Sequence, residues 1–195
     1  MKKYIFILLL GLATLVVNAQ EGTTIFVNYL PSIPLGETAD FSNNISPRGV
    51  DFEVNKFLNE SLSVGFVVSW NLFREKIVGE SFEHEDLLIT GTQFRYTNLA
   101  PINVNVKKYF AGQSDYLPYL GVGVGTAYAK QTNEVGVFEL SQDKWLFNVA
   151  PEIGMLYDMN YKSYLSFKIK YNYCPKAGDF PGMSYISLGI GLGLK

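Results

Sequence analysis

Residues 119–130 read Tyr-Leu-Gly-Val-Gly-Val-Gly-Thr-Ala-Tyr-Ala-Lys, and this stretch decides the fold class. Successive side chains of a β-strand point to opposite faces, so Leu120, Val122 and Val124 share one face while glycines occupy the other. Residues 185–194 repeat the arrangement, with isoleucine and leucine opposite serine and glycine. An apolar face opposite a face of small residues suits a narrow barrel that is apolar outside and crowded inside.

The same period of two recurs along the chain and predicts about eight strands in a single domain. We place these strands at residues 23–33, 47–57, 61–73, 87–110, 116–130, 144–157, 163–174 and 183–194. The fourth strand has two interpretations, because residues 87–97 and residues 101–110 each have a strand pattern. Proline interrupts a ladder, so the two stretches are either one strand kinked at Pro101 or two separate segments.

The connections between the predicted strands alternate in length. The short ones lie near residues 58–60, 111–115 and 158–162. The longer, more polar ones lie near residues 34–46, 74–86, 131–143 and 175–182. Transmembrane barrels alternate tight periplasmic turns with longer outward loops, and their strands must close because a bilayer cannot satisfy an open edge. We therefore predict a closed eight-stranded antiparallel up-and-down transmembrane β-barrel over residues 20–195.

A soluble lipocalin-like barrel is the structural alternative, but it would point its apolar side chains inward around a ligand. Here the face opposite the apolar one carries glycine and charged residues. The side chains predicted to face lipid include Val64, Phe66, Val122, Val124, Phe167, Ile169, Leu188 and Ile190. Aromatic residues gather near the strand ends, as in the two girdles of transmembrane barrels. The predicted interfacial aromatic residues are Trp70, Tyr109, Tyr116, Trp145, Tyr157 and Tyr164.

Charged residues also occur at positions with the parity of the interior face. They are Asp51, Glu53, Lys107, Glu152, Lys168 and Lys170. Side chains fill the lumen of an eight-stranded barrel, and buried charges are stable only when they are paired. We predict a salt-bridge network that plugs the barrel; a gate that opens on rearrangement is the alternative. A hairpin centred on Asn160 would place Glu152 opposite Lys168, and a centre one residue later would place it opposite Lys170.

The N-terminus predicts export from the cytoplasm. Met1–Lys3 is basic, Tyr4–Val17 is apolar, and Val17-Asn18-Ala19 offers the small residues that cleavage after Ala19 requires. A membrane-anchoring helix is the alternative, but the apolar run is short for a span and polar residues follow at once. We therefore predict a signal peptide over residues 1–19.

The sequence offers no catalytic, cofactor or metal motif. His84, the single histidine, lies in the acidic run 83–86, which we interpret as a solvated loop tip because a metal site needs spaced ligands. Cys174, the single cysteine, is interpreted as structural. The Gly-x-Gly-x-Gly run at residues 121–125 lacks the strand-to-helix context of a nucleotide loop. A formal net charge of −2 gives no indication of nucleic-acid binding.

The chain resembles the small outer-membrane β-barrel family of Gram-negative bacteria, the group that includes OmpX and the transmembrane domain of outer membrane protein A. The resemblance is carried by Asn-Val-Lys-Lys-Tyr-Phe at residues 105–110, by residues 116–125 and by the terminal strand at 186–194. The chain departs from the pattern at its end, Leu194-Lys195, where such barrels often have an aromatic residue. The resemblance implies an integral protein of the Gram-negative outer membrane, without one function common to all members.

We expect a non-catalytic, monomeric protein with a structural role or a role in contacts through its outward loops. The segments 74–86 and 131–143 are expected to contact an extracellular or envelope protein, and outer-membrane lipids are the other expected partners. Three alternatives stay open: a narrow channel, an enzyme that modifies outer-membrane lipid, and a subunit of an envelope or secretion assembly. The enzyme would need a Ser/His pair near the membrane rim, which the sequence does not offer.

Overall fold

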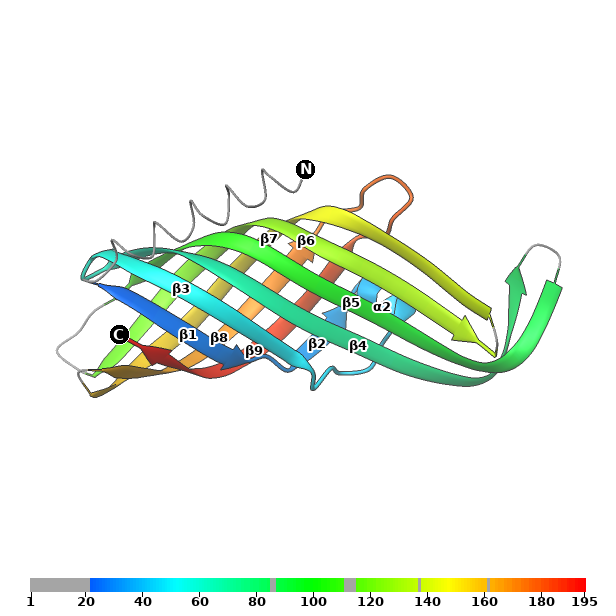
Figure 1. Ribbon diagram of the computed structural model, residues 1–195, viewed down its shortest axis with the longest axis horizontal. Helices are drawn as coiled ribbons and strands as arrows, with labels where there is room; N and C mark the ends of the chain where they lie inside the picture. Colours follow the sequence, from blue (N-terminus) through cyan, green and yellow to red (C-terminus); the bar gives the residue numbers. More distant parts are fainter. Residues whose placement is uncertain (1–21, 85–86, 111–114, 137, 161) are drawn as a thin grey trace, which may run out of the picture.

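A single antiparallel sheet closes on itself and forms the wall of a barrel (Figure 1). Its strands are β1 (Thr23–Tyr29), β2 (Ser32–Leu35), β3 (Gly49–Asn59), β4 (Leu62–His84), β5 (Leu87–Tyr109), β6 (Tyr116–Val135), β7 (Phe138–Asn160), β8 (Ser163–Cys174) and β9 (Met183–Leu194). β1 and β2 pair with successive parts of β9, so together they fill one place in the wall. The 9-stranded sheet therefore has eight places around the barrel, which confirms the predicted closed eight-stranded up-and-down fold.

The structure is a computed structural model that describes residues 22–84, 87–110, 115–136, 138–160 and 162–195, with the backbone alone for 79–84, 87–91 and 160. The predicted signal peptide, residues 1–19, lies outside the described residues, so its cleavage site stays a prediction. Within the described part of the chain, no helix is long and apolar enough to cross a membrane.

Two predicted strands differ from the structure near prolines. The strand predicted at 23–33 divides into β1 and β2 where the chain passes through Leu30 and Pro31. The two candidate stretches around Pro101 form one strand, β5, whose pairing with β6 continues through Pro101. On the other side of β5, the ladder to β4 has a gap between the pairs Val68–Ile102 and Asn71–Leu99, as expected beside a residue that has no N–H to donate.

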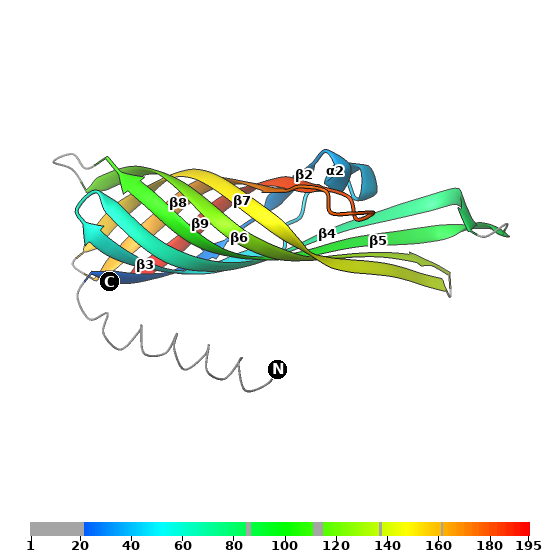
Figure 2. The same ribbon diagram turned by 90° about the horizontal axis from the view of Figure 1, so that it is seen from above.

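The largest difference concerns the segments 74–86 and 131–143, which the sequence predicted as loops. Both are mostly strand, because β4 and β5 meet in one long hairpin and β6 and β7 in another. β4, β5 and β7 each have 23 residues and β6 has 20, against about 10 needed to cross a bilayer. Figure 2 shows these four strands running on beyond the rest of the barrel. We call this part the projecting sheet; it includes residues 74–84 of β4, 87–96 of β5, 131–135 of β6 and 138–143 of β7.

The two ends of the barrel differ in their connections. The hairpins of β3 with β4, β5 with β6 and β7 with β8 have their strand ends on one side of the barrel, which we call the turn end. The Lys195 N–H donates there to the Lys162 carbonyl. The opposite end carries the projecting sheet, the loop between β8 and β9, and the short helix α2 (Glu37–Phe41) (Figure 1). Long connections on one side only are typical of transmembrane barrels, with the long side facing outward.

Candidate functional site

The wall separates two kinds of side chain along every strand that spans the membrane. The predicted lipid-facing residues lie on the outer face: Val64 is half-buried, and Phe66, Val122, Val124, Phe167, Ile169, Leu188 and Ile190 are exposed. Their neighbours in sequence point inward and are mostly buried. Because the outer face is apolar and the inner face is polar, the barrel has the opposite polarity to a lipocalin.

The six predicted charged residues meet in the lumen and form one network. All six are buried. Lys168 Nζ lies 2.6 Å from Asp51 Oδ2 and 3.1 Å from Glu53 Oε2. Lys170 Nζ lies 3.1 Å from the same Asp51 oxygen and donates to Ser69 Oγ at 3.1 Å. Three lysines and three carboxylates leave the network without net formal charge, as the cost of burying unpaired charge requires.

The partner of Glu152 differs from the predicted one. Glu152 lies directly across from Lys170, but its Oε1 forms an ion pair at 2.9 Å with Nζ of Lys107, which also pairs with Glu53. The register that places Glu152 opposite Lys170 is therefore confirmed, but the ion pair expected from that register, with Lys168 or Lys170, is wrong. Gly121 stands between Lys107 and Glu152 in the sheet, and its missing side chain lets the two charged groups meet across one strand.

Glycines of the inner face make room for this network. A Cβ atom at Gly121 would lie 3.0 Å from Glu152 Cγ and 3.1 Å from Lys107 Cγ. A Cβ atom at Gly189 would lie 2.6 Å from Lys168 Cγ. At these two positions, the alternation of glycine with leucine, isoleucine and valine leaves the space that the lysine side chains occupy, whereas Gly125 and Gly193 lie against Asn103 and Phe26.

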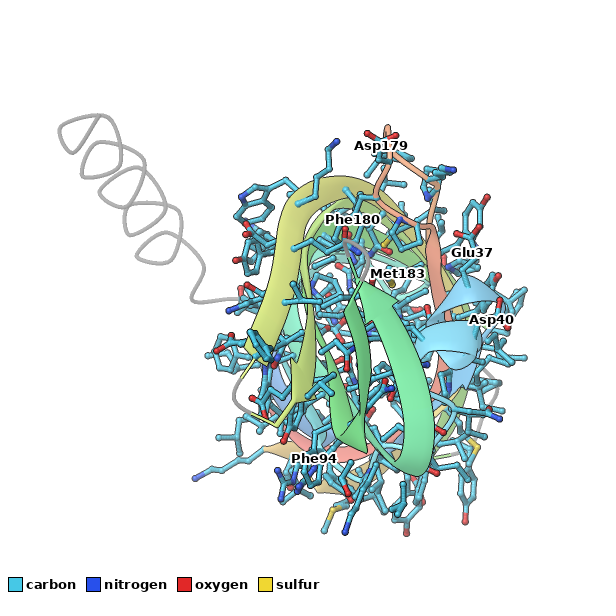
Figure 3. All side chains as sticks on the ribbon, turned by 90° about the vertical axis from the view of Figure 1, so that its right-hand side faces the viewer. Glu37, Asp40, Phe94, Asp179, Phe180 and Met183 are labelled. Atoms are coloured by element: carbon cyan, nitrogen blue, oxygen red, sulfur yellow. The ribbon has the colours of Figure 1, made fainter. Side chains whose placement is uncertain are left out.

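Apolar layers close the lumen on both sides of the network. At the turn end the buried layer consists of Phe26, Tyr109, Tyr119 and Leu156. At the projecting end it consists of Phe73, Leu99, Ala127, Ala129, Leu146, Cys174, Phe180, Met183 and Tyr185. Figure 3 looks onto this end, where Phe180 and Met183 lie over the mouth of the barrel. Thr38 of α2 fixes that region by donating to Met183 Sδ at 3.4 Å and accepting from the Ser184 N–H at 2.9 Å.

The predicted interfacial aromatics divide into two groups. Trp70, Tyr116 and Trp145 are exposed on the outer face, and Tyr157 is half-buried with its ring 4.9 Å from that of Tyr116. Tyr109 is instead 1% exposed, and its ring centre lies 5.4 Å from that of Tyr119 inside the turn end.

Tyr164 is partly buried and packs against the turn-end layer, where it stacks on Phe26. Tyr109 and Tyr164 are therefore corrected from interfacial to luminal. Their sequence positions already had the inward parity, which proximity to a turn does not reveal.

Outside the network, His84 and Cys174 are the residues that the sequence singles out as able to take part in metal binding or catalysis. The His84 side chain lies outside the described side chains, so its interpretation as a loop tip stays a prediction, although its backbone is strand. Cys174 is buried, and its thiol lies 3.3 Å from Asn148 Oδ1. Burial raises the cost of forming a thiolate, which argues against Cys174 as a nucleophile. Among the residues that the structure describes, no three His, Cys, Asp or Glu side chains form a group that could hold a metal ion.

This geometry defines an integral outer-membrane β-barrel protein, with an apolar outer band, aromatic residues at its edges and a closed polar interior. Solved structures with the same fold include Neisserial surface protein A, with TM-score 0.61 and 14% identity over 90% of this chain and 97% of that one. They also include Ail, the attachment invasion locus protein of Yersinia pestis, with TM-score 0.53 and 15% identity over 90% of this chain and 99% of that one.

The profile of the OmpW family matches residues 20–181, and the chain belongs to the OmpW family. The protein is therefore located in the outer membrane of a Gram-negative bacterium. No curated protein sequence matches the chain closely enough to add to this assignment.

Proposed function

We propose that this protein is a non-catalytic outer-membrane barrel that acts by presenting its projecting sheet to an extracellular or envelope protein. The observation that carries the proposal is the length of β4 to β7, which have 20 to 23 residues each. At about 3.3 Å per residue, the ten or so residues beyond a bilayer span reach roughly 30–40 Å along the strands. So much ordered structure outside the membrane is not needed to close a barrel.

The form of the projecting sheet supports a binding role. The described pairing of β4 with β3 ends at the pair Asn71–Gly49, and the pairing of β7 with β8 begins at Val149–Tyr173. Beyond these points β7 is one border of the sheet, and β4 is the other past Arg74, up to which the segment 43–48 still hydrogen-bonds its backbone. A border strand presents backbone N–H and C=O groups that an extended segment of another protein can pair with.

The closed lumen supports this role over that of a narrow channel. A solute would have to pass two apolar layers and the charge network between them. Opening that path would separate buried ion pairs such as Lys168 with Asp51, and each separation costs several kcal/mol. The structure of Ail in complex with the heparin analogue sucrose octasulfate, with TM-score 0.52 and 13% identity over 88% of this chain and 96% of that one, is consistent with ligand binding by barrels of this shape.

A test of the proposal shortens both hairpins without changing their register. Thr132 pairs with Ser141 and Lys76 pairs with Phe94, so an Asn-Gly turn can replace residues 133–140 and residues 77–93. The shortened protein should still migrate differently on a denaturing gel before and after boiling, because the membrane-spanning wall is intact. A photo-crosslinking residue at exposed Ser141 should capture a protein partner in intact cells, and one at exposed Asn59 of the turn end should not.

Single-channel conductance tests the alternative function, that of a narrow channel. In planar bilayers the full chain should show no resolved single-channel openings. Steady openings that persist after both hairpins are shortened would overturn the proposal, as would identical crosslinking from Ser141 and Asn59.

A further inference from the structure

Positively charged side chains lie on the outer face where the apolar band ends. Arg74 and Lys76 follow Trp70 on the same face of β4, and both are exposed. Arg48 precedes β3 at a position whose parity is that of the outward residue Val50, and its carbonyl accepts from the Leu72 N–H on β4. The three cations therefore occupy one area of the outer wall, at the base of the projecting sheet.

Two of these cations lie against aromatic rings of the neighbouring strand. Arg74 Cζ lies 5.4 Å from the centre of the Phe94 ring and 5.5 Å from that of Tyr96. Lys76 Nζ lies 5.7 Å from the Phe94 ring centre. Phe94 lies well away from Phe180 and Met183 of the barrel mouth in Figure 3. The rings hold the charged groups beside the wall, and cation–π contact compensates part of their lost hydration.

These cations differ from the luminal lysines and from Lys195 in their partners. Each luminal lysine pairs with a carboxylate, and Lys195 at the turn end pairs with Asp158 at 2.6 Å. No described carboxylate forms an ion pair with Arg48, Arg74 or Lys76. Glu75, between the last two, points to the other face and accepts from the Asn43 N–H at 2.9 Å. The area thus has positive charge available to an anion.

We propose that Arg48, Arg74 and Lys76 bind phosphate groups of the glycolipid that forms the outer leaflet of the Gram-negative outer membrane. The site lies beyond Trp70, which is 42% exposed at the outer edge of the apolar band. Phosphates of an outer-leaflet lipid lie at this depth, above acyl chains that contact the apolar band. Guanidinium groups bind phosphate through two parallel hydrogen bonds, and ammonium groups bind it as point charges.

The proposal does not depend on the function of the projecting sheet, and its test uses the full mature chain refolded in detergent micelles. Native mass spectrometry would measure binding of bisphosphorylated lipid A, of the same lipid without its phosphates, and of phosphatidylglycerol. The double variant Arg74→Gln, Lys76→Gln should bind bisphosphorylated lipid A about 30-fold more weakly than the unchanged protein, since each cation near an anionic membrane surface contributes about 5-fold. Binding of the dephosphorylated lipid should be equally weak for both proteins.

The matched control is the double variant Lys56→Gln, Lys108→Gln. Both lysines are exposed on the outer face near the turn end, so the net charge changes equally. This control should keep its affinity for bisphosphorylated lipid A within about two-fold, because its changes lie at the opposite membrane surface. Unchanged affinity in the first variant, or equal loss in both variants, would overturn the proposal. Phosphatidylglycerol binding as tight as that of lipid A would assign the site to glycerophospholipid phosphates instead. Heat-dependent gel migration would verify that each variant is folded.

Discussion

The membrane-spanning part of the wall and the projecting sheet are built from the same strands, yet they treat charge in opposite ways. In the lumen, Lys107 and Lys168 each contact two carboxylates, because a buried unpaired charge costs several kcal/mol. Farther along β4, Arg74 and Lys76 lie on aromatic rings without a described ion-pair partner, because water or lipid headgroups can solvate them. One continuous strand therefore passes from one solvent to another, and its side chains change with the solvent.

The largest expected effect comes from breaking the luminal network. Lys107→Gln leaves Glu152 without its ion-pair partner and Glu53 with only Lys168. We expect it to lower the free energy of unfolding by about 3–5 kcal/mol in a urea refolding titration with lipid vesicles. Lys76→Gln removes the same group from the projecting sheet and should change that free energy by less than about 0.5 kcal/mol.

A double-mutant cycle sharpens this prediction by testing the partner of Glu152. Glu152→Gln combined with Lys107→Gln should cost less than the sum of the single changes, by about 1 kcal/mol or more. Glu152→Gln combined with Lys170→Gln should be nearly additive, although these two residues lie directly across the sheet. A larger coupling with Lys170 than with Lys107 would contradict the observed ion pair.

The next effect separates lipid from water on the outer face. Val122→Arg places a charge in the apolar band, where it should cost about 2–4 kcal/mol if the position is near the bilayer midplane. Ser141→Arg makes a similar change at an exposed position of the projecting sheet and should be nearly neutral. The same refolding titration measures both, and equal stabilities would show that the boundary between the two regions is misplaced.

A smaller effect concerns space inside the barrel. Gly121→Val adds side-chain atoms that contact Glu152 and Lys107, which must shift to accommodate them. We expect a loss of about 1–3 kcal/mol in the free energy of unfolding, the usual cost of overpacking. Val122→Ile, one residue away on the outer face, serves as the control and should change stability little. Tolerance of valine at Gly121 would mean that the network has free space beside it.

The smallest effect is expected at the exposed ion pair of the turn end. Lys195 and Asp158 lie 2.6 Å apart, with side chains 26% and 32% exposed. Asp158→Asn should cost no more than about 1 kcal/mol, because water screens and replaces the interaction. A loss of unfolding free energy as large as that of Lys107→Gln would contradict the expectation that an exposed ion pair stabilises the protein less than a buried one.

The alternation of residues determined the barrel and its two faces. Val122 and Leu188 face outward and Lys107 and Lys168 inward because a strand alternates its side chains strictly, and this holds wherever the two faces meet different solvents. The difference between the two faces ends at the membrane surface. Beyond Phe73 both faces of the strand contact polar surroundings, so the apolar period disappears although the strand continues. The segments 74–86 and 131–143 therefore had the composition of loops.

Only the tertiary structure decided which inward groups meet. The register of one hairpin places Glu152 across from Lys170. The closed lumen, however, brings side chains of many strands together, and the space beside Gly121 lets Glu152 form its ion pair with Lys107 instead. Closure likewise brought the inward-facing Tyr109 and Phe26 into one turn-end layer and placed Phe180 over the opposite mouth. Alternation is a local property of the backbone and can be read from the sequence. Contacts across a lumen depend on ring closure and on which neighbours lack a side chain.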